Sequence, residues 1–355
     1  MDIGPNASVK PPQLGAPTRR SVVAPVDWLR ALLTIRSQLV AGHPAIYLSL
    51  VLLTAVAGFG YRFRSDSIFA CQASGYSADR YLAYCNGGHY ADYEHGAFRF
   101  DLEPSLKTSI EEANVLFFGN SRLQIGFSAP ETAKWFSAAS IRYYFMGFIY
   151  FENVNFTESM LREYRPKASV YIINVDEFFV PTLTDVATTV LHDPAARRRY
   201  EIKKLWQGVH ARVCQAVPRA CANRFALFRS RSTGEYTVLG TGQEKSGTVS
   251  YDPAVDAEEV KSSIAIGKEF LTQFGEGKCV ILTMVPFAGT KIGDARAIAK
   301  GLGLKLVAPE IPDGLRMFDG VHLDAPSAER WSLAFLQAAG PVIQSCLARQ
   351  DASAR

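Results

Sequence analysis

The chain has 355 residues, of which 48% are hydrophobic and 20% are charged, as expected for a protein with a substantial core. It is long enough for one large domain or two small ones, and its net charge of +4 is too small to indicate nucleic-acid binding. The sequence has no Cys-x-x-Cys pair, glycine-rich phosphate loop or internal repeat, so we expect no metal and no cofactor.

The first forty residues predict a tail followed by a short amphipathic helix. Residues 1–24 are polar, with Pro, Ala and Ser and no apolar periodicity, which predicts disorder. Residues 25–40 carry Trp, Leu and Ile at helical spacing among arginines, which is typical of a helix at a membrane surface. We expect residues 1–40 to form a cytoplasmic tail with this short helix.

The clearest physical signal is the uncharged run 44–61, which is rich in Leu, Val and Ile. A helix of this length is about 27 Å long, near the minimum for a membrane span, so we predict a transmembrane helix over 41–63. A core helix or a cleaved signal peptide are alternatives, but the run lacks a polar stripe and starts more than forty residues into the chain. Five basic residues precede the run and only two follow closely, which predicts a cytoplasmic N-terminus: Lys10, Arg19, Arg20, Arg30 and Arg36 against Arg62 and Arg64.

The cysteines agree with an external location for the rest of the chain. All six lie after the apolar run, which is the distribution expected in an oxidising compartment. The alternative is that they are free and pack as small apolar groups. Proximity in sequence favours three pairs: Cys71 with Cys85, Cys214 with Cys221, and Cys279 with Cys346.

From residue 114 short apolar runs alternate with amphipathic segments, which predicts an α/β fold with a mainly parallel sheet and helices on both faces. We expect a doubly wound, flavodoxin-like sheet of about five strands. The predicted strands are 115–118, 141–145, 170–174, 280–285 and 304–307. The predicted helices are 131–138, 152–164, 257–274, 294–300 and 325–339.

Two motifs about two hundred residues apart suggest a nucleophile and its base. The strand 115–118 runs into Gly119-Asn120-Ser121, which delivers a serine at the carboxyl end of a strand. Asp319 stands three residues before His322, a spacing that lets the carboxylate orient the imidazole. The sequence therefore predicts a catalytic triad of Ser121, Asp319 and His322.

With these motifs the chain resembles the SGNH/GDSL hydrolase superfamily, in particular membrane-anchored bacterial members that act on envelope glycans. The resemblance covers about 114–339 in pieces, and Asn120 stands where many members carry aspartate. Phe145-Met146-Gly147 is similar to the second block of the family and Ile173-Asn174-Val175-Asp176, loosely, to the third. The resemblance implies an oxyanion hole made by Gly147, Asn174 and the backbone amide of Ser121 or Arg122.

Two further segments admit two interpretations each. Residues 64–110 are dense in Tyr, which suits a glycan groove or, as we favour, packing onto the domain. The insert 181–256 in an SGNH-like domain of 111–345 carries five basic residues. It suits a lid for an anionic or lipid-linked glycan or, as we favour, a solvated helix with surface charges, before a tail at 346–355. The basic residues are Arg197, Arg198, Arg199, Lys203 and Lys204.

The resemblance implies a periplasmic serine esterase or O-acyltransferase, anchored in a bacterial inner membrane, that acts on an acyl group, acetyl above all, of an envelope polysaccharide. The alternative is a catalytically inactive SGNH-like module that binds glycan or partners in an envelope assembly complex. The expected partners are a polysaccharide or glycolipid substrate, a membrane protein that donates acyl groups, and the lipid bilayer through residues 44–61. The residues do not decide between hydrolysis and transfer.

Overall fold

The computed structural model describes residues 44–86, 90–240 and 247–353. The chain divides into two compact units, residues 1–60 and 61–355. Helix α2 (Pro44–Asp66) contains the one helical segment of the described residues that is long and apolar enough to cross a membrane, over Pro44–Arg62. Its large apolar side chains are exposed, as the predicted span requires. The predictions for residues 1–40 lie outside the described residues.

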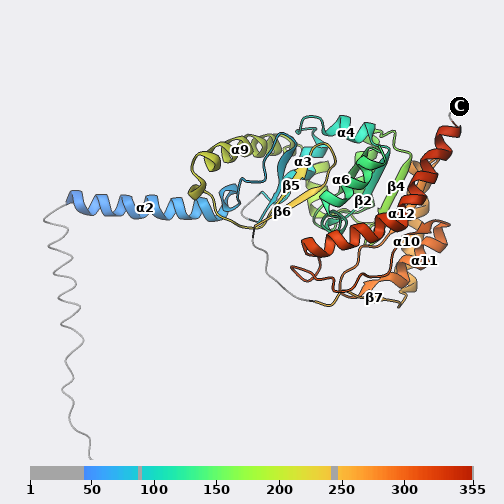
Figure 1. The fold of residues 1–355 in the computed structure, drawn as a ribbon. Helices are drawn as coiled ribbons and strands as arrows, with labels where there is room; N and C mark the ends of the chain where they lie inside the picture. The colour runs from blue at the N-terminus through green and yellow to red at the C-terminus, as the bar shows by residue number, and fades with distance from the viewer. Residues whose placement is uncertain (1–43, 87–89, 241–246, 354–355) are drawn as a thin grey trace, which may run out of the picture. The chain divides into compact units, whose positions relative to one another are not determined.

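The second unit is built on a five-stranded parallel sheet, so the predicted mixed α/β architecture is confirmed (Figure 1). Numbered along the chain, its strands lie in the order 2-1-3-4-5, because the first strand sits between the second and the third. This order makes a topological switch point between the first and third strands, where open α/β sheets place their sites. In spatial order the strands are β10 (Lys305–Leu306), β8 (Cys279–Thr283), β4 (Val170–Asn174), β2 (Val115–Gly119) and β3 (Tyr143–Gly147).

The strands β2, β3 and β4 bury both faces because helices cover the sheet on both sides. On β2, Val115 and Phe117 join one apolar core, whereas Leu116 and Phe118 join the other, as the period of two requires. The first core is closed by α5 (Ser121–Gly126), α6 (Ala129–Ala138) and α12 (Ala325–Ser353). The second is closed by α3 (Tyr93–Arg99), α4 (Leu106–Glu112), α7 (Val154–Tyr164), α10 (Ala257–Phe270) and α11 (Ile292–Leu302).

The last helix is longer than the sequence pattern predicts. The expected helix 325–339 continues past Pro341 to Ser353, so most of the expected tail 346–355 is helical. Within this extension Ile343 and Cys346 are buried against the sheet, which explains why the helix continues. A buried apolar stripe stabilises a helix more than local propensity does.

A second, antiparallel sheet joins the two segments that the sequence treats separately. Strand β1 (Arg80–Cys85) comes from the juxtamembrane segment, and it pairs with β5 (Ala226–Ser230) of the insert. Strand β6 (Tyr236–Leu239) completes the sheet. The insert also supplies the helices α8 (Asp185–His192) and α9 (Ala196–Ala216) and the 3₁₀ turn η2 (Pro218–Ala220).

The juxtamembrane tyrosines pack into the core, as favoured from the sequence. Tyr81 and Tyr93 are fully buried and Tyr90 nearly so, and Tyr81 and Tyr93 meet edge to face. Of the neighbouring histidines, His95 is buried with its Nε2 3.3 Å from the Glu152 carboxylate, so it belongs to this packing. These rings line no open groove.

All three expected disulfides are present: Cys71–Cys85, Cys214–Cys221 and Cys279–Cys346. The first ties the start of the second unit to β1, and the second closes the end of α9. The third joins β8 to α12 across a separation of 67 residues. The alternative of free, packed cysteines is therefore wrong.

Candidate active site

Ser121 is presented by the turn that joins β2 to α5. Asn120 is the N-cap of α5, and its Oδ1 accepts the backbone N–H of Arg122 at 3.0 Å. Asparagine is among the best residues for this position because its side-chain oxygen satisfies an amide that the helix leaves without a partner. Ser121 is therefore the first residue of the helix, at the carboxyl edge of the sheet.

Ser121, His322 and Asp319 form a continuous chain of hydrogen bonds. The Nε2 atom of His322 lies 2.8 Å from Ser121 Oγ, and its Nδ1 lies 2.7 Å from Asp319 Oδ2. A carboxylate can only accept, so Nδ1 carries the proton and Nε2 is left to accept the serine hydroxyl proton. The structure thus brings the three residues together in the arrangement of a nucleophile, a base and an orienting acid.

The short turn between Asp319 and His322 fixes the acid in place. Asp319 Oδ1 accepts the backbone N–H groups of Val321 at 3.1 Å and His322 at 2.9 Å, while Oδ2 serves the imidazole. Burial raises the pKa of the Asp319 carboxyl, but the bonds from the His322 ring and the two amides outweigh it and hold the pKa below its ordinary value. The carboxylate form is therefore the stable one at the site.

Asn174 reaches the same edge from the end of β4. Its Oδ1 accepts the backbone N–H of Val285 at 3.0 Å, which fixes the orientation of the amide. Its Nδ2 is buried and has no hydrogen-bond partner among the residues that the structure describes. A Cβ built on Gly119 would lie 3.0 Å from Asn174 Cβ, so the glycine lets the β2 turn pack against this side chain. Asn174 thus holds an unused N–H donor at the switch point, as an anion-binding group must.

Gly147 ends β3 directly opposite Gly119 in the parallel register. A side chain there has no room, because a Cβ would lie 2.8 Å from Gln124 Cγ and 3.2 Å from Gly119 O. The Gly147 carbonyl accepts Gln124 Nε2 at 2.8 Å, and the next amide, of Phe148, donates to Gly119 O at 3.1 Å. The strand end that carries the predicted oxyanion donor is therefore held against the serine turn.

Two buried charged residues outside the parallel sheet, Arg229 and Glu94, contact the end of β3 that carries Gly147. Arg229 of β5 is fully buried, and its Nη1 donates to Gly147 O at 3.0 Å and to Glu94 at 2.8 Å, while Nη2 donates to Phe145 O. Glu94 of α3 also accepts the backbone N–H of Ile149 at 3.0 Å. The pair satisfies each charge and fixes the backbone on both sides of Gly147.

Arg122 has a different environment from the one the resemblance implies. Its backbone N–H is taken by the Asn120 cap, so it is not a free oxyanion donor. Its buried guanidinium pairs with Asp176 and stacks over the Phe287 ring, 3.9 Å from the centroid. Asp176 also accepts a hydrogen bond from Asn120 Nδ2 at 3.3 Å. This bond connects the segment 173–176, at the end of β4, to the serine turn.

Two of the five basic residues of the insert hold α9 to the rest of the unit, whereas Arg197, Arg198 and Arg199 are exposed at the start of the helix. Lys203 pairs with Asp92, and Lys204 pairs with Glu103. The insert contacts the triad segment through Phe225, which stacks on Phe318 with centroids 5.6 Å apart. Phe318 stacks in turn on the His322 ring at 5.8 Å.

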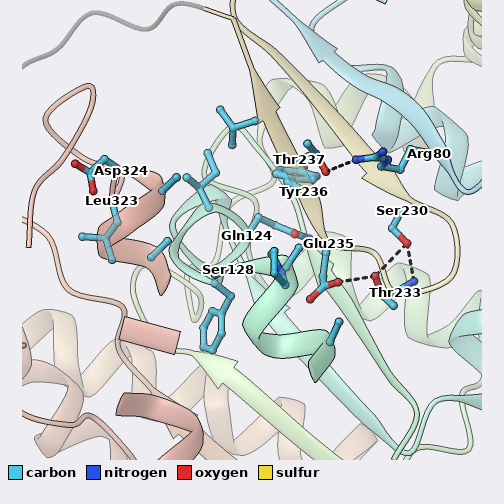
Figure 2. A pocket seen from close by; sticks show the side chains of 18 of the residues that line it. Arg80, Gln124, Ser128, Ser230, Thr233, Glu235, Tyr236, Thr237, Leu323 and Asp324 are labelled. Atoms are coloured by element: carbon cyan, nitrogen blue, oxygen red, sulfur yellow. Dashed lines mark hydrogen bonds between the residues drawn. The ribbon is translucent and has the colours of Figure 1, made fainter. Parts of the chain in front are cut away.

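A cavity of about 920 Å³ is lined in part by Phe225 and Phe318 of this aromatic stack. Figure 2 shows Leu323 and Asp324 on one side of it, Gln124 and Ser128 between, and the residues of β6 opposite. Neither Ser121 nor His322 lines it, so the cavity adjoins the triad without containing it. Its lining is mainly apolar, with a polar end at Asp79, Ser230, Ser232, Thr233 and Glu235.

One group of side chains in the described part of the chain has metal-ligand atoms within reach of one another: His210, Cys214 and Cys221. The two sulfurs are bonded to each other. Both nitrogens of His210 have partners, the Tyr76 hydroxyl at 3.1 Å and the Cys71 carbonyl at 3.0 Å. All three side chains are therefore already bonded within the protein, and they stabilise the end of α9.

No family model, curated protein or solved structure matches the chain. The functional argument therefore rests on the geometry of the site alone.

Sequence reasoning missed Glu94, Arg229 and Gln124, which hold the Gly147 strand end. Glu94 and Arg229 are 135 residues apart, and neither lies in a motif. Gln124 follows Ser121 by three residues, which places both on one face of α5. This spacing is the only sequence signal that could have indicated any of the three.

Proposed function

We propose that the chain is a membrane-anchored serine esterase or O-acyltransferase of the SGNH/GDSL type, acting on an acyl ester of an envelope polysaccharide. The observation that carries the proposal is the hydrogen-bonded chain from Ser121 through His322 to Asp319. The Asp319 carboxylate can only accept a hydrogen bond, so it favours the imidazole tautomer that leaves His322 Nε2 to accept from Ser121 Oγ. The parallel sheet with its 2-1-3-4-5 order supports the SGNH assignment but is shared by many other families.

In this mechanism Ser121 Oγ attacks the acyl carbon of the ester while its proton passes to His322 Nε2. Asp319 stabilises the imidazolium that forms. The negative charge on the acyl oxygen is met by Asn174 Nδ2 and the Gly147 amide, with the amide of Ser121 at the N-terminus of α5. His322 returns the proton to the leaving alcohol, which gives an acyl-serine. Water or a sugar hydroxyl then attacks the acyl-serine by the same steps in reverse, giving hydrolysis or transfer.

The anchor and compartment belong to the same proposal. Residues 44–62 cross a bacterial inner membrane with the N-terminus in the cytoplasm, and the second unit lies in the periplasm. Three disulfides after the apolar run support an oxidising compartment. An alkaline phosphatase, which is active only outside the cytoplasm, should be active when it is fused after Arg64. A fusion active only as a cytoplasmic reporter would reverse the orientation.

The test of the reaction uses the full chain in detergent or nanodiscs with p-nitrophenyl acetate. Wild type should release p-nitrophenol, and Ser121→Ala should abolish the release without moving the thermal midpoint. Ser137→Ala, at an exposed position of α6, is the matched control and should keep full activity. Activity that survives Ser121→Ala would remove the serine from the mechanism. Folded wild type inactive on every acyl donor would favour the glycan- or partner-binding module.

A further inference from the structure

The loop after β3 turns two aromatic side chains outward beside the candidate site. Tyr150 and Phe151 follow Gly147, the last residue of β3, by three and four residues, and they are 40% and 56% exposed. The nearest aromatic residues on either side along the chain, Phe148 and Phe156, are fully buried. Burial of apolar area therefore does not explain why aromatic rings occupy these two positions.

The backbone of this loop is unusual for large side chains. Tyr150 has a φ of 62° and Phe151 a φ of 55°, so both lie in the left-handed region that glycine and asparagine favour. Five other non-glycine residues of the described chain have positive φ, and all five are polar. The residues on both sides hold the loop, because the Ile149 N–H donates to Glu94 at 3.0 Å and Glu152 is buried. Strain that surrounding structure maintains in this way is often found at functional sites.

The two rings connect to the triad by separate routes. The Phe151 ring centroid lies 5.6 Å from the guanidinium carbon of Arg122, the residue that follows Ser121. Tyr150 begins a row of ring contacts that ends at the imidazole of the triad. Centroids of neighbouring rings in this row are 5.6–6.3 Å apart, in the order Tyr150, Tyr84, Phe225, Phe318 and His322. We call these five residues and Phe151 the aromatic rim.

The aromatic rim offers partly exposed ring faces and little free charge. Its other members, Tyr84, Phe225, Phe318 and His322, are half-buried. The charge of Arg122, beside Phe151, is balanced by Asp176.

This combination identifies the kind of ligand. A sugar ring has an apolar face of C–H groups and a polar edge of hydroxyls, and its C–H groups are attracted to the negative face of an aromatic ring. A long acyl chain instead needs an enclosed apolar site, and an anionic ligand needs unpaired cations. The aromatic rim therefore fits a neutral sugar ring better than either of these ligands.

We infer that Tyr150 and Phe151 form a stacking platform for a neutral sugar ring of the glycan, and that the rest of the aromatic rim borders the path from this platform to Ser121. The inference rests on the proposed function, because it names the part of the acylated glycan that the same site holds. Stacking on one sugar holds the neighbouring, ester-bearing sugar at Ser121. Recognition then depends on sugar rings and not on the acyl group alone.

Binding is measured first, because it does not require the reaction. The full chain in nanodiscs is titrated in a calorimeter with neutral hexasaccharides of glucose, mannose, xylose and N-acetylglucosamine. We expect at least one of them to bind, and Phe151→Asn to weaken its binding about tenfold through the loss of one stacked ring.

Three observations separate the ring from the backbone that carries it. Asparagine tolerates positive φ, so the thermal midpoint of Phe151→Asn should stay equal or rise while binding falls. Phe151→Trp keeps an aromatic face and should retain binding. Leu333→Ala, at a 48% exposed position of α12, is the matched control and should bind as wild type does.

Kinetics then tests the platform in the reaction. Wild type should release acetate from a partly O-acetylated form of the hexasaccharide that binds. When Tyr150→Ala is combined with Phe151→Ala, KM for this substrate should rise about 100-fold. The rise should be much smaller for p-nitrophenyl acetate, which has no sugar ring.

The failure of the platform and the failure of the reaction give different results. A folded wild type that binds a hexasaccharide but cleaves no acyl ester refutes the proposed reaction and not the platform. A wild type that binds none of the hexasaccharides overturns the platform, whether or not it hydrolyses p-nitrophenyl acetate. Unweakened binding by Phe151→Asn also overturns it, as do equal losses of the double variant on the two substrates.

Discussion

The parallel sheet and the antiparallel sheet both contribute to the candidate site, but through different contacts. The parallel sheet supplies the groups of the proposed reaction from the carboxyl ends of adjacent strands, with Ser121 after β2 and Asn174 at the end of β4. The antiparallel sheet supplies none of them and instead holds the Gly147 strand end through Arg229. The first arrangement follows from strand order, whereas the second needs partners far apart in the chain. The chemistry and its support should therefore respond differently to substitution.

The largest effect is expected within the triad. Asp319→Asn keeps the shape of the side chain but turns an acceptor into a group that can donate toward His322 Nδ1, which favours the wrong imidazole tautomer. We expect kcat for p-nitrophenyl acetate to fall by about 10⁴-fold, as in other triads, with a small change in thermal midpoint. Asp313→Asn, at an exposed position of the same segment, is the control. An unchanged kcat in Asp319→Asn would show that the Asp319 carboxylate takes no part in the reaction.

The next effect concerns the support from the antiparallel sheet. Arg229→Met leaves the Glu94 carboxylate buried without its counter-charge, and the Phe145 and Gly147 carbonyls lose a donor. We expect the free energy of unfolding to fall by about 3–5 kcal/mol, and kcat to fall more than KM rises. Urea unfolding and steady-state kinetics measure both quantities.

Two variants check the interpretation of this result. Arg224→Met, exposed on the same segment, should change neither quantity. Adding Glu94→Gln to Arg229→Met should restore part of the stability, because the unpaired charge is then gone. A strictly additive double variant would show that the two residues do not act as a pair.

These two regions also differ in how far the sequence predicts them. Four of the five strands and the Ser121 turn follow from apolar runs that end in small or polar residues, and β3 lies two residues later than expected. The spacing of Asp319 and His322 is local, so one turn is enough to bring them together. By contrast, β1 pairs with β5 across 141 to 150 residues, and no periodicity in either segment specifies its partner.

The proposed oxyanion donors could be predicted from the sequence only in part. Asn174 is placed by the end of a predicted strand, but only the bond between its Oδ1 and Val285 shows which end of the amide is free. Arg122 was expected to offer its amide, yet the Asn120 cap uses it. The free end of the Asn174 amide is thus decided by Val285, which lies outside the motif, whereas the use of the Arg122 amide is decided by Asn120, which lies inside it.

The disulfides beside the two sheets close loops of very different lengths, so the two regions can also be compared by the stability that each disulfide contributes. Cys279–Cys346 closes a loop of 67 residues across the parallel sheet, and Cys214–Cys221 closes one of 7 beside the antiparallel sheet. In the chain-entropy treatment, replacing both cysteines by serine should cost about 4 kcal/mol for the first pair and about 2 kcal/mol for the second. Urea unfolding under non-reducing conditions measures each loss. Equal losses would show that native packing, not loop closure, decides the stability.

The smallest effect is a pH dependence at the polar end of the cavity. Burial, with the nearby Asp79 charge, raises the pKa of Glu235 to about 8 against the partial compensation of a hydrogen bond from Thr233. The unfolded carboxyl titrates near 4.5, so between pH 4.5 and 8 the folded state holds a proton that the unfolded state has lost. This contribution to stability is complete below pH 4.5, falls as the pH rises through this window, and levels off above about pH 8. Glu235→Gln, which mimics the protonated acid, should flatten this part of the profile of thermal midpoint against pH, whereas Glu276→Gln, at an exposed turn, should not. A slope that persists in Glu235→Gln would assign the pH dependence to another group.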